Sequence, residues 1–231
     1  MLWNRNVTVD FVHPTNDLSG YDLVIAPSLY LAGPAASENL TGFVRNGGHL
    51  LVSYFSGIVD LNDTVYPGAA PGALREVLGL TIPEFLPLHE NETVTLSDSR
   101  TGTAWTDDIE VSTAEVLARY VDGPAANGPA ITRNAFGAGS AWYVSTKLDG
   151  DDLDSLLLDV LNAAGIEAAR GVDGIESITR STGTEDFLFL INHTDADQTV
   201  PATGTELLTN SAVDGTVLVP AGLTRVVHTP R

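Results

Sequence analysis

Carboxylates are the most numerous ionisable groups in this sequence, and one run of them has the composition of a calcium site. The run is Asp149-Gly150-Asp151-Asp152-Leu153-Asp154. An EF-hand loop takes oxygen ligands from its first, third and fifth positions, with a glycine at the sixth and a glutamate at the twelfth. Here the fifth position is Leu153, the sixth is Asp154 and the twelfth is Val160. The spacing excludes an EF-hand, and we expect Asp151 and Asp152 to begin a helix, where negative charge is favourable.

Metal and thiol chemistry lack the residues that they need. The five histidines are scattered without i,i+4 pairing, and the chain has no cysteine, so no zinc site is predicted. These histidines are His13, His49, His89, His193 and His228. Gly137-Ala138-Gly139 is too short for a dinucleotide-binding loop and leads into a strand, so we interpret it as a turn. We predict no metal and no cofactor.

The elements that would position such groups begin with a strand, helix, strand unit. Val7–Val12 alternates apolar and polar residues and Asp22–Pro27 is a short apolar run, so both predict parallel strands. Ala35–Asn46 predicts a helix that ends at Gly47-Gly48, and His49–Phe55 predicts the next buried strand. This order predicts a doubly wound, flavodoxin-like α/β domain similar to the class I glutamine amidotransferase architecture. Amidotransferase chemistry itself needs a nucleophilic cysteine, which the chain lacks.

Shorter strands dominate the rest of the chain. Glu92–Tyr120 predicts an antiparallel excursion, and Asp151–Ala164 predicts an amphipathic helix that closes the first domain. After a predicted linker at 168–174, short strands separated by turn residues predict a small antiparallel β-sandwich. We therefore predict an α/β domain at 1–167 and a small all-β domain at 168–231.

The segment Tyr21–Leu88 carries the most specific signature of the sequence. Its strongest parts are Ser53-Tyr54-Phe55-Ser56-Gly57-Ile58-Val59-Asp60, Asn62-Asp63, Pro71-Gly72-Ala73-Leu74-Arg75, Leu78-Gly79 and Glu84-Phe85. These residues resemble the trimerisation domain of family 42 β-galactosidases, and the end of the chain more weakly resembles the small C-terminal β domain of that family. The resemblance implies a homotrimeric glycosidase that hydrolyses terminal β-D-galactosides, with two catalytic glutamates on a separate (β/α)8 barrel.

Catalysis is expected to lie outside this segment. A retaining glycosidase holds two carboxyl groups about 5–5.5 Å apart. The glutamates of this chain lack the barrel context in which the family places that pair, and we interpret them as surface or structural residues. Those that we considered are Glu38, Glu76, Glu84 and Glu110. We predict no catalytic residue here, and we expect this chain to be the non-catalytic C-terminal part of a longer enzyme, from which a helix that precedes Met1 has been cut away.

The resemblance implies that the carboxyl edge of a central strand makes subunit contacts. The candidate contact residues are Tyr54, Phe55, Ile58 and Val59. Open α/β sheets bind ligands or partners at this edge. The alternative is that these side chains are ordinary core residues, because aromatic residues serve both cores and interfaces.

The charge of the chain limits its partners and its environment. The net charge is −19, from 30 acidic and 11 basic residues, and Lys147 is the only lysine. We therefore expect no nucleic-acid partner. No apolar run approaches the ~20 residues that span a bilayer and no secretory signal is visible, so we expect no membrane partner and a cytoplasmic location. The acidic surface repels itself in dilute buffer, but molar salt screens this repulsion within about 3 Å, so the composition favours a halophilic source. The alternative is an acidic protein from a GC-rich genome.

Two further function classes remain. A free-standing protein of amidotransferase-like fold with a binding or enzymatic role is one, although the missing cysteine argues against it. Carbohydrate binding by the terminal domain is the other, but residues 171–231 contain neither Trp nor Tyr. Phe187 and Phe189, two positions apart on a predicted strand, favour same-face packing over a sugar platform.

Overall fold

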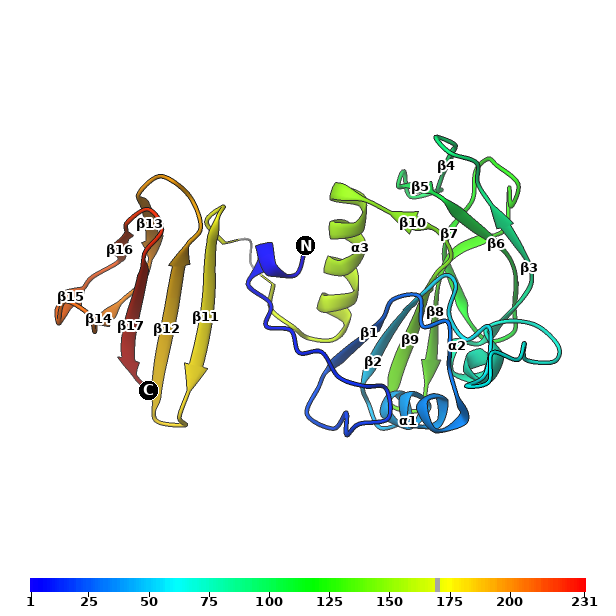
Figure 1. Cartoon of the computed structure of the whole chain (residues 1–231), viewed down its shortest axis with the longest axis horizontal. Coiled ribbons are helices and arrows are strands. Elements are labelled where there is room, and N and C mark those ends of the chain that lie inside the picture. The colour runs from blue at the N-terminus through cyan, green and yellow to red at the C-terminus, as the bar shows by residue number, and fades with distance from the viewer. Residues whose placement is uncertain (169–170) are drawn as a thin grey trace. The chain divides into compact units, whose positions relative to one another are not determined.

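The structure of the 231-residue chain is a computed structural model that describes residues 1–168 and 171–231. It divides into two compact units, which we call the central unit and the terminal unit. The central unit is Phe11–Ile166, whereas the terminal unit joins Met1–Asp10 to Glu167–Arg231 (Figure 1). Among the described residues, none of the helices has the length and hydropathy that crossing a bilayer requires.

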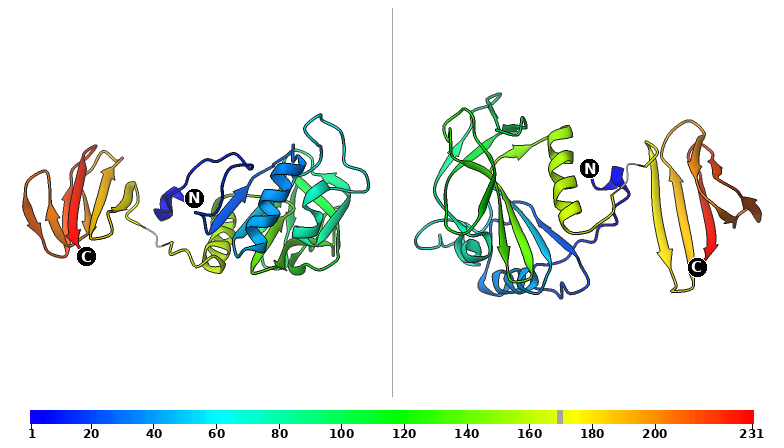
Figure 2. Two further views of the ribbon diagram at one scale, coloured as in Figure 1. Left: turned by 90° about the horizontal axis from the view of Figure 1, so that it is seen from below. Right: turned by 180° about the vertical axis from the view of Figure 1, so that it is seen from behind.

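The central unit contains a five-stranded mixed sheet (Figure 2). Its strand order is β1-β2-β9-β8-β7. Its strands are β1 (Leu23–Ala26), β2 (His49–Ser53), β7 (Glu115–Arg119), β8 (Pro129–Phe136) and β9 (Gly139–Val144). β1, β2 and β9 run parallel, whereas β8 is antiparallel to both of its neighbours. This sheet places the end of β2 next to the end of β9, where the candidate contact residues begin.

Two helices pack against β2. α1 (Pro34–Arg45) joins β1 to β2 and starts with a proline, whose missing N–H is not needed at that position. Its apolar face buries Leu40 and Phe43 in the same core as Leu50. α3 (Gly150–Ala163) carries Asp151 and Asp152 in its first turn, as expected from the sequence.

The prediction of a doubly wound domain of flavodoxin-like or class I glutamine amidotransferase-like fold is wrong. Only β1, β2 and β9 are parallel, and the chain enters β9 through an antiparallel hairpin from β8 instead of a second helical crossover. Strands also outnumber helices throughout the described residues. The predicted strand Val7–Val12 does not form: none of its residues is in a strand, and Phe11 is 99% exposed. The alternation of apolar and polar residues shows that a segment is able to form a β-strand, but the strand forms only where the edge of a sheet is free to pair with it.

Small sheets fill the chain between β2 and β8. This segment contains two short helical turns and four strands: η2 (Gly72–Leu74), α2 (Arg75–Leu78), β3 (Leu80–Pro87), β4 (Thr93–Thr95), β5 (Thr101–Thr103) and β6 (Trp105–Val111). β3 pairs with β6, and β5 pairs with β4 and with β10 (Lys147–Leu148). Gly79 ends α2 in a left-handed conformation with φ of 64°. The pair β3–β6 matters most for the site, because it carries Phe85 and Trp105 to the end of β2.

The terminal unit consists of antiparallel strands and the 3-10 turn η1 (Trp3–Arg5). One sheet has the order β11-β12-β17-β14-β15, and β13 pairs with β16. The strands are β11 (Ile175–Ser181), β12 (Glu185–Asn192), β13 (Gln198–Pro201), β14 (Gly204–Glu206), β15 (Ser211–Val213), β16 (Thr216–Val219) and β17 (Thr224–Pro230). The N-terminal segment is anchored here, because the Ser177 N–H donates to Asn6 Oδ1 at 3.0 Å and the ring centroids of Trp3 and His193 are 5.5 Å apart.

The predicted boundary between the two domains falls between residues 167 and 168, next to the predicted linker. Residues 169 and 170 of the predicted linker lie outside the described residues. The division into domains at 1–167 and 168–231 stays a prediction.

Candidate subunit interface

The chain turns sharply where β2 ends. The Tyr54 N–H still donates to Val144 O of the neighbouring strand at 2.7 Å, but Phe55 has a φ of 62°, which non-glycine residues rarely adopt. Gly57 follows with a φ of 64°, and a Cβ there would be 2.2 Å from Pro71 O. The turn directs Phe55 outward and leaves it 37% exposed. Such outliers gather where function requires them.

Five aromatic rings surround this turn, and we call them the aromatic cluster. They are Tyr30, Tyr54, Phe55, Phe85 and Trp105. Phe55 stacks on Tyr30 at a centroid distance of 5.1 Å and meets the edge of Trp105 at 5.2 Å. Tyr54 and Phe85 contact the other sides of Trp105, at 6.1 and 5.6 Å. Trp105 is therefore the common contact of three other rings, and its orientation decides theirs.

A buried carboxylate holds Trp105 in place. Asp107 Oδ1 accepts a hydrogen bond from Trp105 Nε1 at 2.7 Å, and Asp107 Oδ2 accepts one from the Tyr143 hydroxyl at 2.7 Å. Asp107 is fully buried. Burial raises the pKa of its carboxyl from 3.8 to about 6, although both hydrogen bonds act in the opposite direction. The aromatic cluster is thus attached to the only strongly perturbed carboxyl in the described residues.

A short hairpin beside the turn exposes further apolar side chains. Val59 bridges both Leu31 and Val65 through its backbone, and Asp60 accepts hydrogen bonds from the backbone N–H groups of Asn62 and Thr64 at 2.8 and 3.0 Å. These amide contacts, with that of Thr64 the larger, lower the pKa of Asp60. The turn they build projects Leu61 outward, so the hairpin has a fixed shape with an apolar tip.

Four large apolar side chains are exposed in this region, and we call them the apolar patch. They are Leu31, Phe55, Leu61 and Val65, with exposed fractions of 46%, 37%, 72% and 69%. Large exposed apolar groups that lie together mark interaction sites. The patch packs against the residues beneath it. Phe55 contacts the other rings of the aromatic cluster, and Leu61 packs so closely on Gly33 that a Cβ there would be 2.7 Å from Leu61 Cγ.

The four predicted contact residues have different surroundings. Phe55 is exposed and belongs to the apolar patch, and Tyr54 and Ile58 are half-buried. Val59 is only 1% exposed, so its side chain belongs to the core and its backbone supports the hairpin. That these residues contact another subunit stays a prediction. Sequence reasoning missed Leu31, Leu61 and Val65; the available signal was Leu61, an isolated leucine among the polar residues of a turn.

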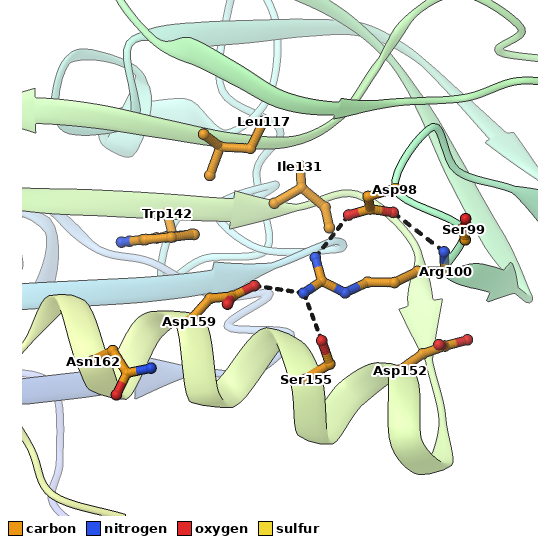
Figure 3. Close-up of a pocket in the computed structure, with 10 residues that line it drawn as sticks. All are labelled: Asp98, Ser99, Arg100, Leu117, Ile131, Trp142, Asp152, Ser155, Asp159 and Asn162. Atoms are coloured by element: carbon orange, nitrogen blue, oxygen red, sulfur yellow. Dashed lines mark hydrogen bonds and ion pairs between the residues drawn. The ribbon is translucent and has the colours of Figure 1, made fainter.

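A cavity of about 560 Å³ lies along α3 in the central unit (Figure 3). Arg100 crosses it and contacts Asp98 Oδ2 at 2.7 Å, Asp159 Oδ2 at 2.5 Å and Ser155 Oγ at 2.9 Å. Asp152 accepts a hydrogen bond from the Thr101 N–H at 2.9 Å. These contacts connect the β4–β5 hairpin to α3. The charged side chains of the cavity therefore already have partners, and we interpret the cavity as structural.

The glutamates considered for catalysis all lie at the surface. Each of them is exposed, and they are distributed over α1, α2, β3 and β6: Glu38, Glu76, Glu84 and Glu110. This placement agrees with their interpretation as surface residues.

Comparison with known proteins identifies relatives for both parts of the chain. Residues 1–167 match the family model described as β-galactosidase trimerisation domain, and residues 174–227 match the one described as β-galactosidase C-terminal domain. A β-galactosidase of Arthrobacter sp is 38% identical over 218 residues, which are 94% of this chain and 31% of the relative. The chain therefore spans about a third of the length of the curated relatives that it matches.

Solved structures share the fold. The β-galactosidase from Bacillus circulans sp. alkalophilus superposes with a TM-score of 0.91 and 32% identity, over 98% of this chain and 36% of that one. The polyextremophilic β-galactosidase from the Antarctic haloarchaeon Halorubrum lacusprofundi gives a TM-score of 0.84 and 28% identity, over 100% of this chain and 34% of that one.

Proposed function

This chain belongs to the family 42 β-galactosidases, and we propose that it is the assembly part of such an enzyme. In this proposal, domain 1–167 associates with two further copies into a homotrimer, and domain 168–231 is the small β domain that follows it. The contact is made by the apolar patch together with the predicted residues Tyr54 and Ile58.

The apolar patch is the observation that supports this proposal. Leu61 and Val65 are more than two thirds exposed, yet they stand on a hairpin fixed by backbone bridges and the Asp60 turn. A rigid apolar surface loses little conformational freedom on binding, so most of its burial contributes to affinity. A Leu side chain that becomes fully buried contributes about 2 kcal/mol.

Sedimentation of the chain in high salt, with two matched variants, tests the proposal. Leu61→Asp places a charge in the apolar patch, and Leu218→Asp places the same charge on β16, where Leu218 is 53% exposed. We expect Leu61→Asp to lower the association constant about 30-fold and Leu218→Asp to leave it unchanged. Equal effects of the two variants, or a monomer at every concentration, would contradict the proposal.

We assign the hydrolysis of terminal β-D-galactosides to a catalytic barrel of the same protein. The four glutamates considered for catalysis are exposed and lie on four different elements, which supports this assignment. The purified chain is then expected to release no product from a chromogenic galactoside. Turnover that persists after removal of contaminating enzyme would contradict it.

We further propose a halophilic source and a salt-rich cytoplasm. The net charge of −19 and the single lysine support this, since repulsion among surface carboxylates is screened within about 10 Å at 0.1 M salt and about 3 Å at 1 M. The thermal unfolding midpoint should then rise steeply with NaCl up to molar concentrations. A midpoint that stays constant over this range would favour the alternative of an acidic protein from a GC-rich genome.

A further inference from the structure

An unbroken series of contacts runs from a buried titratable group to the apolar patch. Asp107 and Trp105 lie two positions apart on β6, so their side chains are on the same side of the strand, and they are hydrogen-bonded at 2.7 Å. Trp105 meets Phe55 at 5.2 Å, and Phe55 stacks on Tyr30 at 5.1 Å. Tyr30 in turn donates to Asp63 Oδ1 of the hairpin at 3.1 Å.

We propose that Asp107 positions the association surface, and that self-association through the apolar patch depends on the ionisation of its carboxylate. This inference rests on the proposed function of the patch as a subunit contact. It adds a positioning residue that does not itself touch the partner, and a direction for the effect of pH.

Protonation would disturb the two hydrogen bonds that Asp107 accepts. Its ionised carboxylate has an acceptor oxygen for each donor, Trp105 Nε1 and the Tyr143 hydroxyl. A protonated carboxyl must also donate its own proton. The indole cannot accept that proton, so the Tyr143 oxygen must take it, and the Tyr143 proton then loses its acceptor. The Trp105 bond also loses its charge assistance, which roughly doubles the strength of such bonds.

The groups that face Asp107 leave it as the one that changes charge near neutral pH. β9 contributes Tyr143, and Tyr120 follows β7; burial raises the pKa of both well above the usual tyrosine value, so both stay neutral. β3 contributes Phe85, which does not titrate. Asp108, the next residue on β6, is exposed.

The expected direction is opposite to that of general electrostatics. Copies with a net charge of −19 repel one another, and acidification reduces this repulsion and so favours association. Loss of the Asp107 charge loosens Trp105 and the rings on it, so more side-chain freedom must be lost on association. In molar salt, where repulsion is screened, self-association should therefore weaken below about pH 6, the pKa of Asp107.

Sedimentation equilibrium of the chain in 1 M NaCl between pH 5 and pH 8 tests this inference, with Asp107→Asn and the matched control Asp108→Asn. We expect the association constant of the wild type to rise about fivefold over this range, the difference between a charge-assisted and a neutral hydrogen bond. Asp107→Asn should keep the lower value at every pH, whereas Asp108→Asn should follow the wild type. A wild-type constant that does not change with pH, or a variant Asp107→Asn that keeps the wild-type profile, overturns the inference.

A spectroscopic signature separates this inference from the proposed function. The chain has three tryptophans, so the indole N–H signal of Trp105 can be assigned by substitution and followed by NMR. We expect its shift to titrate near pH 6 in the wild type and not in Asp107→Asn. A chain that stays monomeric at all pH values refutes the proposed function and the dependence of assembly on Asp107. A Trp105 signal that does not titrate refutes the positioning role alone, even if the chain associates.

Discussion

Replacing Asp107 by asparagine should change how the stability of the central unit depends on pH. The carboxyl is fully buried, and its pKa in the folded chain is about 6 against 3.8 for an unperturbed group. A folded-state pKa above the unfolded one means that the folded chain binds the proton more tightly. The stability contributed by this group is therefore fully present below pH 3.8 and is lost as the pH rises through 6.

The size of the effect follows from the shift. A difference of about two pKa units corresponds to about 3 kcal/mol between strongly acidic and neutral solution. About 1.4 kcal/mol of this lies between pH 5 and pH 8, one unit below the folded pKa and well above it. Asparagine is nearly isosteric and stays neutral: its Oδ1 can accept from Trp105 Nε1, and its amide can donate to the Tyr143 oxygen.

Urea unfolding of wild type and Asp107→Asn at several pH values, at fixed salt and protein concentration, measures the effect. The unfolding free energy of the variant minus that of the wild type should grow by about 1.4 kcal/mol from pH 5 to pH 8. The difference removes the contributions of other carboxylates, and Asp108→Asn controls for the loss of one charge. A difference that is the same at all pH values would refute the reasoning.

Other predictions concern single turns and buried polar groups. Asn192→Ala should destabilise the terminal unit by about 2–3 kcal/mol in urea unfolding, because the buried amide bonds Ala196 O and Val219 O; a change below 0.5 kcal/mol would contradict this. Gly57→Ala should lower the thermal midpoint by several degrees, since its Cβ would be 2.2 Å from Pro71 O, and an unchanged midpoint would argue against this backbone. Burial raises the pKa of Glu206, but hydrogen bonds from the Thr209 side chain and nearby amides more than offset this, so its pKa is lowered. Glu206→Gln should therefore destabilise the terminal unit at neutral pH, and the difference in unfolding free energy from the wild type should shrink as the pH falls below about 4. A difference that grows on acidification would contradict this prediction.

Local elements of the central unit were accessible from the sequence. The helix predicted at Ala35–Asn46 is α1, shifted by one residue, and the strand predicted from His49 is β2. The turn at Gly137-Ala138-Gly139 joins β8 to β9. Clear start and stop signals explain why these elements could be predicted, because proline begins α1 and glycines follow its end.

The arrangement of the sheet was not accessible. Periodicity shows which residues are buried, but not which strand edge they join. His49 pairs with Ser140, 91 positions away in the chain, and this pairing replaces the second crossover that a doubly wound domain requires. A long-range choice of this kind depends on the packing of the whole core.

Of the four residues of the apolar patch, only Phe55 was among the candidates named from the sequence. Trp105 to Val111 reads WTDDIEV, and nothing in these letters distinguishes the buried Asp107 from the exposed Asp108. The register of β6 on β3, which sets Asp107 opposite Phe85, makes that distinction. Leu61 stands out in the sequence as an isolated leucine among polar residues, but its exposure depends on a turn that two backbone hydrogen bonds to Asp60 build.

The attachment of Met1–Asp10 to the terminal unit has a consequence for synthesis on the ribosome. Asn6 finds its partner Ser177 only 171 positions later. At about 5–20 residues per second, the first segment waits roughly 10 to 30 seconds for this partner. During that time the apolar side chains of Val9 and Phe11 are exposed, as they still are in the structure, and exposed apolar residues of this kind can associate with foreign chains. The whole central unit, which lies in the chain between the two parts of the terminal unit, can fold first, and Met1–Asp10 then completes the terminal unit together with the strands that follow Ile166.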